Sequence, residues 1–407
     1  MSDLAATTPA RWSILSIAAY LACSWTWCIG MFLPVILMRD YGPWSFAVFA
    51  VPNVVGAALM GVVLMPPGAS RSLFVRHIAA IRSFSLVTLA FQWFFAIWLL
   101  MGVGLGVEGL VVVVAVFGMS AIPIAKAHRV AVALWCASVA CAIWWLATAA
   151  PTMPWQDTFA GARPGALLFL APVCIFGFAL SPYLDGTFHL ALQRLPGWRG
   201  SMAFILGLGV LFLAMIAFTF FYAPSIIDSA NTRGATLGPQ WAALPVIVHL
   251  ALQLGFTMAV HFKEEIKPEP AEPQMSTSLA SDPAAGPVLG IILGAVAFFL
   301  SKQGYGDLSL TETIYRLFMS FYALIFPAYV WLCMIPAWRA GKPTSRHIKV
   351  WLAACALAAP AYWMGFFEHR EFWLLPGLGV VLLARWLVPR ANAGGRGEDS
   401  PMQERTT

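Results

Sequence analysis

Two apolar segments of the chain contain the polar residues whose types and spacing could bind an ion or a small solute. Segment 23–34 reads CSWTWCIGMFLP, and segment 177–189 reads GFALSPYLDGTFH. Each combines hydroxyl groups with a proline, and the second adds a carboxylate, Asp185. Proline removes an amide donor from a helix and glycine weakens the helix further, so backbone carbonyls become free. Interrupted membrane helices hold ions and solutes with such freed backbone groups.

The composition shows what kind of element must position these residues. Of the 407 residues, 60% are apolar and 10% are charged, whereas a soluble domain has roughly 45–50% and about 25%. So few charged groups cannot cover a water-soluble chain of this size, which excludes a soluble enzyme, a nucleic-acid binder and a disordered scaffold. The 18 Trp and 29 Phe suit contact with lipid. We therefore expect an all-α polytopic membrane protein whose partner is the lipid bilayer.

Twelve apolar runs predict twelve membrane spans, at about 20 residues per crossing. The runs do not alternate as barrel strands do, which favours helices. With the N-terminus in the cytoplasm, most of the 24 Lys and Arg residues fall in cytoplasmic loops, so the net charge of +6 reflects topology. We expect both termini in the cytoplasm and a location in a bacterial inner membrane. The runs are 12–38, 44–65, 83–106, 107–125, 130–150, 166–192, 201–222, 240–262, 287–301, 313–338, 350–367 and 372–389.

The two polar segments occupy corresponding places in two blocks of five helices. The blocks are 11–150 and 165–338, and the polar segment lies in the first helix of each. Because five is odd, the second block enters the membrane from the opposite side, which predicts an inverted repeat. The remaining segments are a cytoplasmic N-terminus (1–10), a disordered polar loop (263–286), two extra helices (347–390) and a disordered cytoplasmic tail (391–407).

The first two helices resemble those of a known family. Segment 25–61 has a Trp-x-Ile-Gly run, a Tyr-Gly turn and a second helix rich in small residues, and in this it is similar to sodium:solute symporters. The layout over residues 11–390 resembles the amino acid–polyamine–organocation superfamily, which has the leucine-transporter (LeuT) fold. The resemblance implies five plus five inverted helices followed by two more, with a solute site between the broken first and sixth helices.

The residues expected to bind the solute surround the two breaks. A carboxylate inside a membrane helix is costly unless it is paired or hydrated, so Asp185 is the sharpest candidate, with capping of a half-helix as the alternative. The hydroxyls could line a cavity or bond back to their own helices. His189, one turn after Asp185, could share its proton or lie at the membrane interface. The expected set is Ser24, Trp25, Thr26, Trp27, Gly30, Gln92, Ser181, Tyr183 and Asp185.

The polar residues of the eighth helix help to distinguish sodium from a proton as the coupling ion. The family resemblance implies a sodium site between carbonyls of the first helix and hydroxyls of the eighth. Helix 240–262 has no adjacent hydroxyl pair, and Thr257 is its single hydroxyl. Sodium held by Thr257 and the Cys23–Cys28 backbone is one hypothesis, and proton coupling through Asp185 or His249 is the other. His249 shares a helix face with Gln253, where hydrogen bonds to a neighbouring helix are an equal alternative.

Two charged pairs, Arg39-Asp40 and Glu312/Arg316, lie near the outer face in this topology and are interpreted as interfacial pairs or gates. The seven cysteines fall inside apolar runs without metal-ligand spacing to histidine. We therefore expect no metal and no cofactor beyond a coupling Na⁺ or H⁺.

These patterns favour a secondary active transporter that moves a small polar or organic solute by alternating access, coupled to Na⁺ or H⁺. A membrane-embedded enzyme acting on a lipid-linked substrate is one alternative, although Asp157, Asp228 and Asp307 are scattered over three loops without a paired motif. A non-transporting sensor on a transporter scaffold is the other. The absence of a nucleotide-binding motif in the sequence excludes a built-in ATPase. We expect no enzyme activity and no nucleic-acid partner; the sequence leaves the oligomeric state open.

Overall fold

The computed structural model describes residues 13–104, 106–149, 159, 161–231, 240–265, 284–300, 303–337 and 341–388. Within these residues the chain is helical apart from turns and one short antiparallel hairpin, β1 (Gly304–Tyr305) and β2 (Leu308–Ser309). The predicted N-terminal segment 1–10, the tail 391–407 and most of the polar loop, 266–283, lie outside the described residues.

Most of the helices are long, and several are continued by short segments of tighter or wider winding. The 3₁₀ segments are η1 (Ile124–Lys126), η3 (Pro164–Ala166), η4 (Ser181–Leu184), η9 (Glu371–Trp373) and η10 (Ala384–Leu387), and the π segments are η5 (Gly207–Phe212), η7 (Phe321–Ile325) and η8 (Val330–Met334). The α-helices are α1 (Ile14–Trp25), α2 (Cys28–Tyr41), α3 (Trp44–Val63), α4 (Ala69–Arg76), α5 (Ile78–Val103), α6 (Val107–Ser120), α7 (Ala127–Thr148), α9 (Leu167–Leu180), α10 (Gly186–Arg194), α11 (Trp198–Leu206), α12 (Leu213–Asn231), α13 (Gln240–Glu265), α14 (Ala285–Phe299), α15 (Leu310–Ser320), α16 (Phe326–Tyr329), α17 (Ile335–Ala337), α18 (Ser345–Phe366) and α19 (Leu374–Leu383).

The chain is an all-α polytopic membrane protein. Among the described residues, eight helical segments are long and apolar enough to cross a bilayer, and the bent pair α1–α2 makes a ninth. Helices α6 and α14 have only 14 and 15 residues, and α19 is extended by η9 and η10 rather than by regular helix. The prediction of twelve spans therefore stays a prediction, because three of its segments are shorter than a full crossing.

Both predicted helix breaks are present in the structure. Helices α1 and α2 meet at an angle of 53°, with the break at Thr26 and Trp27, four residues before Gly30. Pro34 lies inside α2 and does not end it. The second break runs through η4 to Asp185, whose extended backbone begins α10.

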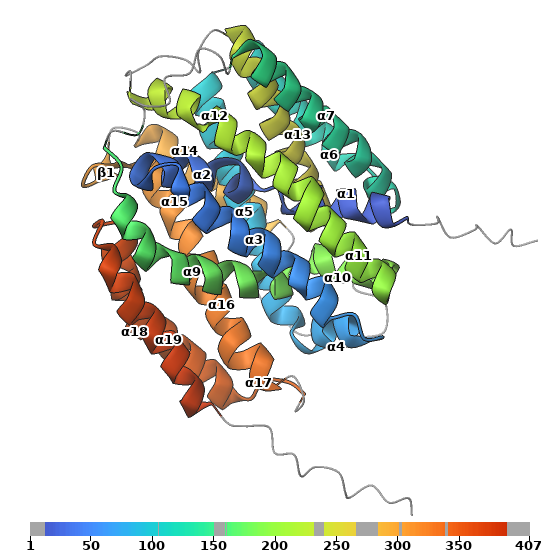
Figure 1. Ribbon diagram of the computed structural model, residues 1–407, viewed down its shortest axis with the longest axis vertical. Coiled ribbons are helices and arrows are strands. Elements are labelled where there is room, and N and C mark those ends of the chain that lie inside the picture. The colour runs from blue at the N-terminus through green and yellow to red at the C-terminus, as the bar shows by residue number, and fades with distance from the viewer. Residues whose placement is uncertain are drawn as a thin grey trace, which may run out of the picture.

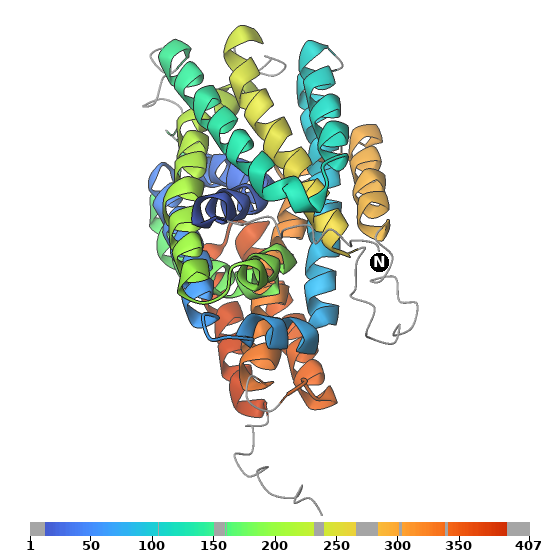
Figure 2. The same cartoon turned by 90° about the vertical axis from the view of Figure 1, so that its right-hand side faces the viewer.

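Small residues allow helix backbones to approach closely, as is common in membrane bundles. Gly286, Gly290 and Gly294 lie one turn apart on α14 and all face α5, so the two helices run side by side (Figure 2). A Cβ on Gly290 would lie 2.7 Å from the Cβ of Trp93. Gly56 of α3 likewise lies directly against the backbone of α9 at Phe178.

The last two long helices form a pair beside the rest of the bundle. Figure 1 shows α18 and α19 lying side by side, with α9 next to them. The connection between them ends in η9, where Glu371 accepts a hydrogen bond from Tyr41 at the C-terminal end of α2. This arrangement positions the ion-pair network described below.

Candidate functional site

The two helix breaks meet through a pair of hydroxyl groups. Thr187 Oγ1 on α10 lies 3.2 Å from Ser24 Oγ on α1. The Thr187 amide and hydroxyl both donate to Asp185 Oδ1, each at 2.7 Å. Asp185 is completely buried and caps the N-terminus of α10, where the backbone amides and the helix dipole favour a negative charge. Of the two alternatives for Asp185, the cap is therefore present, and it uses only one carboxylate oxygen.

The other carboxylate oxygen faces a histidine that sequence reasoning did not select. Asp185 Oδ2 lies 4.0 Å from Nε2 of His261 on α13. Both side chains are completely buried, and neither Oδ2 nor either His261 nitrogen has a hydrogen-bond partner among the described residues. The edge of the His261 ring packs against Trp27, with centroids 5.7 Å apart. This is a buried carboxylate–imidazole pair with unused donors and acceptors.

The ring of His189 contacts other groups than the carboxylate of Asp185, with which the sequence had suggested that it could share a proton. Its ring is buried, with Nδ1 3.0 Å from Ser70 Oγ and Nε2 3.0 Å from the carbonyl oxygen of Tyr183. The extended backbone of Asp185, with ψ of 113°, turns its carboxylate back onto the start of α10. The two side chains therefore do not follow the one-turn spacing of a continuous helix.

His261 is the last member of a repeat of polar residues along α13. His249, Gln253, Thr257 and His261 recur every four residues. Four residues are about 40° more than a full turn, so three steps rotate the side chain by about 120°. His249 accordingly packs on Phe218 of α12, while His261 has turned toward α10. The repeat marks His261 as a further polar position of α13, and the packing of α13 against α10 pairs it with Asp185.

Aromatic side chains fill the space between the breaks. Trp27 packs edge-on against Phe84 of α5 and Tyr322 of η7, with ring centroids 5.4 Å apart in each case. Trp25 donates from Nε1 to Asn53 Oδ1 at 2.7 Å and packs on Phe188. The predicted residues of the first break therefore lie together, and Trp27 occupies their centre.

The backbone carbonyls near the first break are taken up by hydroxyls from other helices. Thr257 Oγ1 lies 3.3 Å from the carbonyl oxygen of Cys23 and 2.9 Å from that of Gln253. Tyr315 donates to the carbonyl oxygen of Cys28 at 3.0 Å. The structure thus brings together Thr257 and the α1 backbone, the groups of the hypothetical sodium site, although Thr257 supplies a single hydroxyl.

The other predicted residues differ in what they contact. Ser181 donates to the carbonyl oxygen of Tyr322 at 3.2 Å and so joins the second break to η7. Gln253 donates to Ser138 of α7 at 2.8 Å; it therefore binds a neighbouring helix. Gln92 is buried, and neither of its amide atoms has a hydrogen-bond partner in the part of the chain that the structure describes; Tyr183 is half-buried.

An apolar cavity of about 60 Å³ lies between α2, α9, η7 and the end of α18. Tyr322 lines one side of it and Arg316 another. Solute sites usually measure roughly 300–1,000 Å³, so the space is too small for an organic solute as it stands. The cavity lies between Arg316 of the ion-pair network described next and Tyr322, whose ring also contacts Trp27 of the first break.

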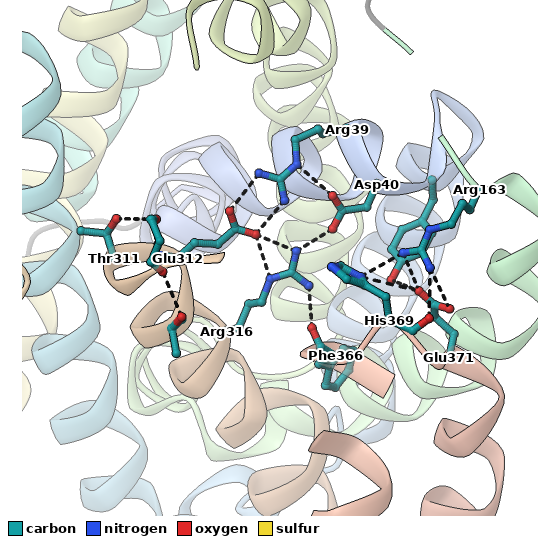
Figure 3. A network of polar contacts seen from close by, with 12 residues as sticks. Arg39, Asp40, Arg163, Thr311, Glu312, Arg316, Phe366, His369 and Glu371 are labelled. Atoms are coloured by element: carbon teal, nitrogen blue, oxygen red, sulfur yellow. Dashed lines mark hydrogen bonds and ion pairs between the residues drawn. The ribbon is translucent and has the colours of Figure 1, made fainter. Parts of the chain in front are cut away.

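The predicted pairs Arg39-Asp40 and Glu312/Arg316 form one network (Figure 3). Arg39 binds Glu312 through two parallel hydrogen bonds of 2.7 and 2.9 Å. Arg316 bridges Glu312 and Asp40, at 2.7 and 2.6 Å, and donates to the carbonyl oxygen of Phe366 at 2.7 Å. Bidentate arginine–carboxylate pairs of this kind combine strength with fixed geometry. The network ties α2 to α15 and to the end of α18.

A second cluster joins α2 and the segment before η3 to the α18–α19 connection. Arg163 pairs with Glu371 at 2.8 Å, and Tyr41 donates to the same carboxylate at 3.1 Å. His369 Nδ1 lies 2.9 Å from Arg163. Burial, together with the nearby guanidinium of Arg316, lowers the pKa of His369.

The residues considered for a metal site or an acidic active site are placed as follows. The described residues contain no group of three or more His, Cys, Asp and Glu side chains that could hold a metal ion. Of the acids considered for an enzyme, Asp307 lies in the β1–β2 turn and Asp228 in α12, while Asp157 lies outside the described residues.

Comparison with known proteins shows a likeness in structure but none in sequence. No protein-family model matches the chain, and no curated protein matches it. Among solved structures, the chain is similar to Mhp1, a nucleobase-cation-symport-1 family transporter, in a closed conformation with bromovinylhydantoin bound. The identity is 13%, the TM-score is 0.45, and the likeness covers 93% of each chain.

Proposed function

We propose that the chain is a secondary active transporter for a small polar or organic solute, working by alternating access across a bacterial inner membrane with both termini in the cytoplasm. One observation carries the proposal: two membrane helices are interrupted, and their breaks meet at a fully buried carboxylate, Asp185. Interrupted helices and buried carboxylates are both expensive in a bilayer, and both are typical of substrate and ion pathways.

The arrangement suggests how access would alternate. The network of Arg39, Asp40, Glu312 and Arg316 closes one end of the molecule by joining α2 to α15. If these ion pairs separate, the small cavity beneath them becomes an entrance that leads to the breaks. Trp27, which fills the centre, then has to rotate away to make room for the solute. The inverted repeat of 11–150 and 165–338 supplies the rocking motion in this proposal.

The proposed solute site consists of the residues around the breaks. Ser24, Thr26 and Ser181 offer hydroxyls, Trp25 and Trp27 offer apolar faces, and Asp185 offers a charge. Such a set fits a small molecule that combines a flat or apolar part with hydrogen-bonding groups. Gly30, Gln92 and Tyr183 remain part of the proposal as flanking positions.

A binding screen followed by a flux assay tests this function. A solute that binds only the folded protein increases the free energy of unfolding, by about 2.7 kcal/mol when its concentration is 100 times the Kd. The melting temperature rises as a result. Each solute that stabilises the purified protein is then used in a counterflow assay in proteoliposomes, where uptake needs no ion gradient. We expect saturable counterflow that is lost in Trp27→Ala, and retained in Trp44→Ala, whose indole is 76% exposed on the outside of α3. Binding without counterflow would favour the sensor, and conversion of a lipid-linked substrate would favour the enzyme.

A further inference from the structure

The Asp185–His261 pair is a site in its own right. Asp185 Oδ1 is fully used as a helix cap, whereas Oδ2 points at an imidazole whose two nitrogens are unpartnered. The Oδ2–Nε2 distance is 4.0 Å, longer than a hydrogen bond but short enough for one to form after a small movement. Buried polar groups are normally hydrogen-bonded, so an unsatisfied pair of this kind needs an explanation.

We propose that Asp185 and His261 bind one proton between them, and that this proton is the ion that couples to solute movement. The coupling of the proton to solute movement rests on the proposed transport function, whereas the binding of the proton does not. It names the coupling ion and replaces the predicted His249 with His261.

Electrostatics favour the binding of a proton here. An ionised carboxylate facing a neutral imidazole leaves one net negative charge in a site from which water is excluded. One added proton gives either a carboxylic acid beside a neutral ring or a carboxylate beside an imidazolium, and both have no net charge. The proton also supplies the hydrogen bond that Oδ2 and Nε2 lack. The site therefore gains charge neutrality and a bond from one proton.

The donor set suits a proton better than sodium. Hard cations are bound by several oxygen ligands, and here one of the two carboxylate oxygens is committed to Thr187. The remaining side of the site is an imidazole edge and the ring of Trp27. Imidazole nitrogens accept protons near neutral pH.

The neighbouring titratable groups leave the pair isolated. Tyr322 of η7 is close enough to interact electrostatically with Asp185, and Cys28 of α2 interacts with Tyr322. On α10, His189 is turned toward Ser70 and Tyr183, and at the start of α5, His77 is turned toward Tyr329. A phenol and a thiol are neutral at physiological pH, so the charge of the site depends on the pair itself.

The position of the pair explains how proton binding could act on the solute. Asp185 begins α10, and its cap partner Thr187 touches Ser24 of the first break. Closing the 4.0 Å gap draws the start of α10 toward α13. That movement shifts the groups on both sides of the Ser24–Thr187 contact, where the two breaks meet.

Nuclear magnetic resonance of the full chain in nanodiscs, with ¹⁵N-labelled histidine, tests the proton site without any solute. The chain has seven histidines, and the signal absent in His261→Gln belongs to His261. We expect this signal to titrate, with a midpoint that falls by at least about one pH unit in Asp185→Asn, a tenfold loss of proton affinity. His249→Gln is the matched control, since His249 is equally buried, and it should leave the His261 midpoint unchanged. A midpoint that is the same in Asp185→Asn and in the wild type overturns the shared proton.

Two further measurements test the proton site without Asp185→Asn and test its coupling to transport. If Asp185→Asn does not fold, infrared spectra at several pH values report the carboxylic acid band in the wild type and in His261→Gln. We expect the pH dependence of this band to differ between the two proteins. The same pH dependence in both also overturns the shared proton. Coupling is tested with the transported solute, by imposing either a pH gradient or a sodium gradient on proteoliposomes. Accumulation driven by the pH gradient supports coupling, and accumulation driven only by sodium overturns it. A titrating pair in a protein without counterflow keeps the proton site and removes the transport function.

Discussion

The hydroxyl of Thr219 donates to the carbonyl oxygen of Gly30 at 3.0 Å. Pro34 lies four residues after Gly30 in α2 and has no amide hydrogen, so it cannot make the usual helix bond to that oxygen. Helix α12 therefore supplies the hydrogen-bond donor that the Gly30 carbonyl lacks within α2. Tyr222, one turn later on α12, donates to the carbonyl oxygen of Met31, the next residue along α2. The carbonyl oxygens around the proline of α2 are thus hydrogen-bonded inside the membrane, because the neighbouring helix carries hydroxyl groups at the matching positions.

This relationship predicts a specific coupling between Thr219 and Pro34. Thr219→Val removes the donor and leaves a buried carbonyl unpaired, which should cost about 1–3 kcal/mol of stability. In a Pro34→Ala background the backbone amide returns, so Thr219→Val should cost clearly less. Unfolding of the four proteins in a double-mutant cycle measures the difference. Thr219→Ser keeps a hydroxyl and is the control; equal costs in both backgrounds would show that Thr219 does not compensate for Pro34.

Much of the fold could be predicted from the sequence because its signals are local. Few charges and long apolar runs indicate a helical membrane protein, and the hydroxyls, prolines and Asp185 locate the two breaks. A proline in a span does not say which residue unwinds, however. The first break lies at Thr26 and Trp27, because hydroxyls on α12 support α2 around Pro34. The number of full spans was equally beyond the sequence, because the helices α6, α14 and α19 lie in apolar runs but are shorter than a full crossing.

The site was less predictable because its contacts join distant parts of the chain. Arg39 and Glu312 are 273 positions apart and were interpreted as members of two separate pairs. Asp185 was selected for its charge, but its partner depends on the rotation of α13, which places His261 and not His249 beside it. Only the packing of the helices determines such pairings.

The contact between α14 and α5 depends on Gly290. A Cβ at this position would lie against the backbone of Ala90 and 2.7 Å from the Cβ of Trp93. We expect Gly290→Ala to destabilise the protein by about 1–3 kcal/mol, the usual cost of overpacking. Gly379→Ala in α19 is the control, because nothing lies within 4 Å of its added Cβ, and higher helix propensity should make it neutral or stabilising. Thermal unfolding compares the two; equal melting temperatures would contradict close packing at Gly290.

His77, which precedes α5, should make the protein sensitive to acid. Burial lowers the pKa of His77 from 6.5 to about 4, and the charge of Arg76 adds to this effect. The folded state therefore binds this proton more weakly than the unfolded state, so stability is present above pH 6.5 and is lost as the pH falls toward 4.

His77→Gln keeps a polar group near Tyr329 and cannot be protonated in this range. We expect the melting temperature of the wild type to fall more steeply than that of His77→Gln between these pH values, by a few degrees in total. Thermal melts at matched ionic strength measure the two slopes. Parallel curves would mean that His77 is protonated as readily in the folded protein as in the unfolded chain.

Glu312 should control access to the cavity beneath the ion-pair network. Glu312→Gln removes the carboxylate that binds both Arg39 and Arg316, and breaking a buried pair from one side typically costs about 3–5 kcal/mol. The two guanidinium groups then repel each other with only Asp40 between them. We expect the closed arrangement to open more often, which exposes the cavity-lining thiol of Cys174.

The reaction of Cys174 with a membrane-impermeant thiol reagent measures this opening. We expect labelling to be at least about tenfold faster in Glu312→Gln, equivalent to a shift of about 1.4 kcal/mol in the opening equilibrium. Cys174→Ala identifies the labelled site, since Cys136 is exposed even in the closed arrangement. Glu368→Gln is the matched control, because this carboxylate pairs with Tyr305 at the same end of the molecule and takes no part in the network. Unchanged labelling in Glu312→Gln would show that the ion pairs stabilise the fold without acting as a gate.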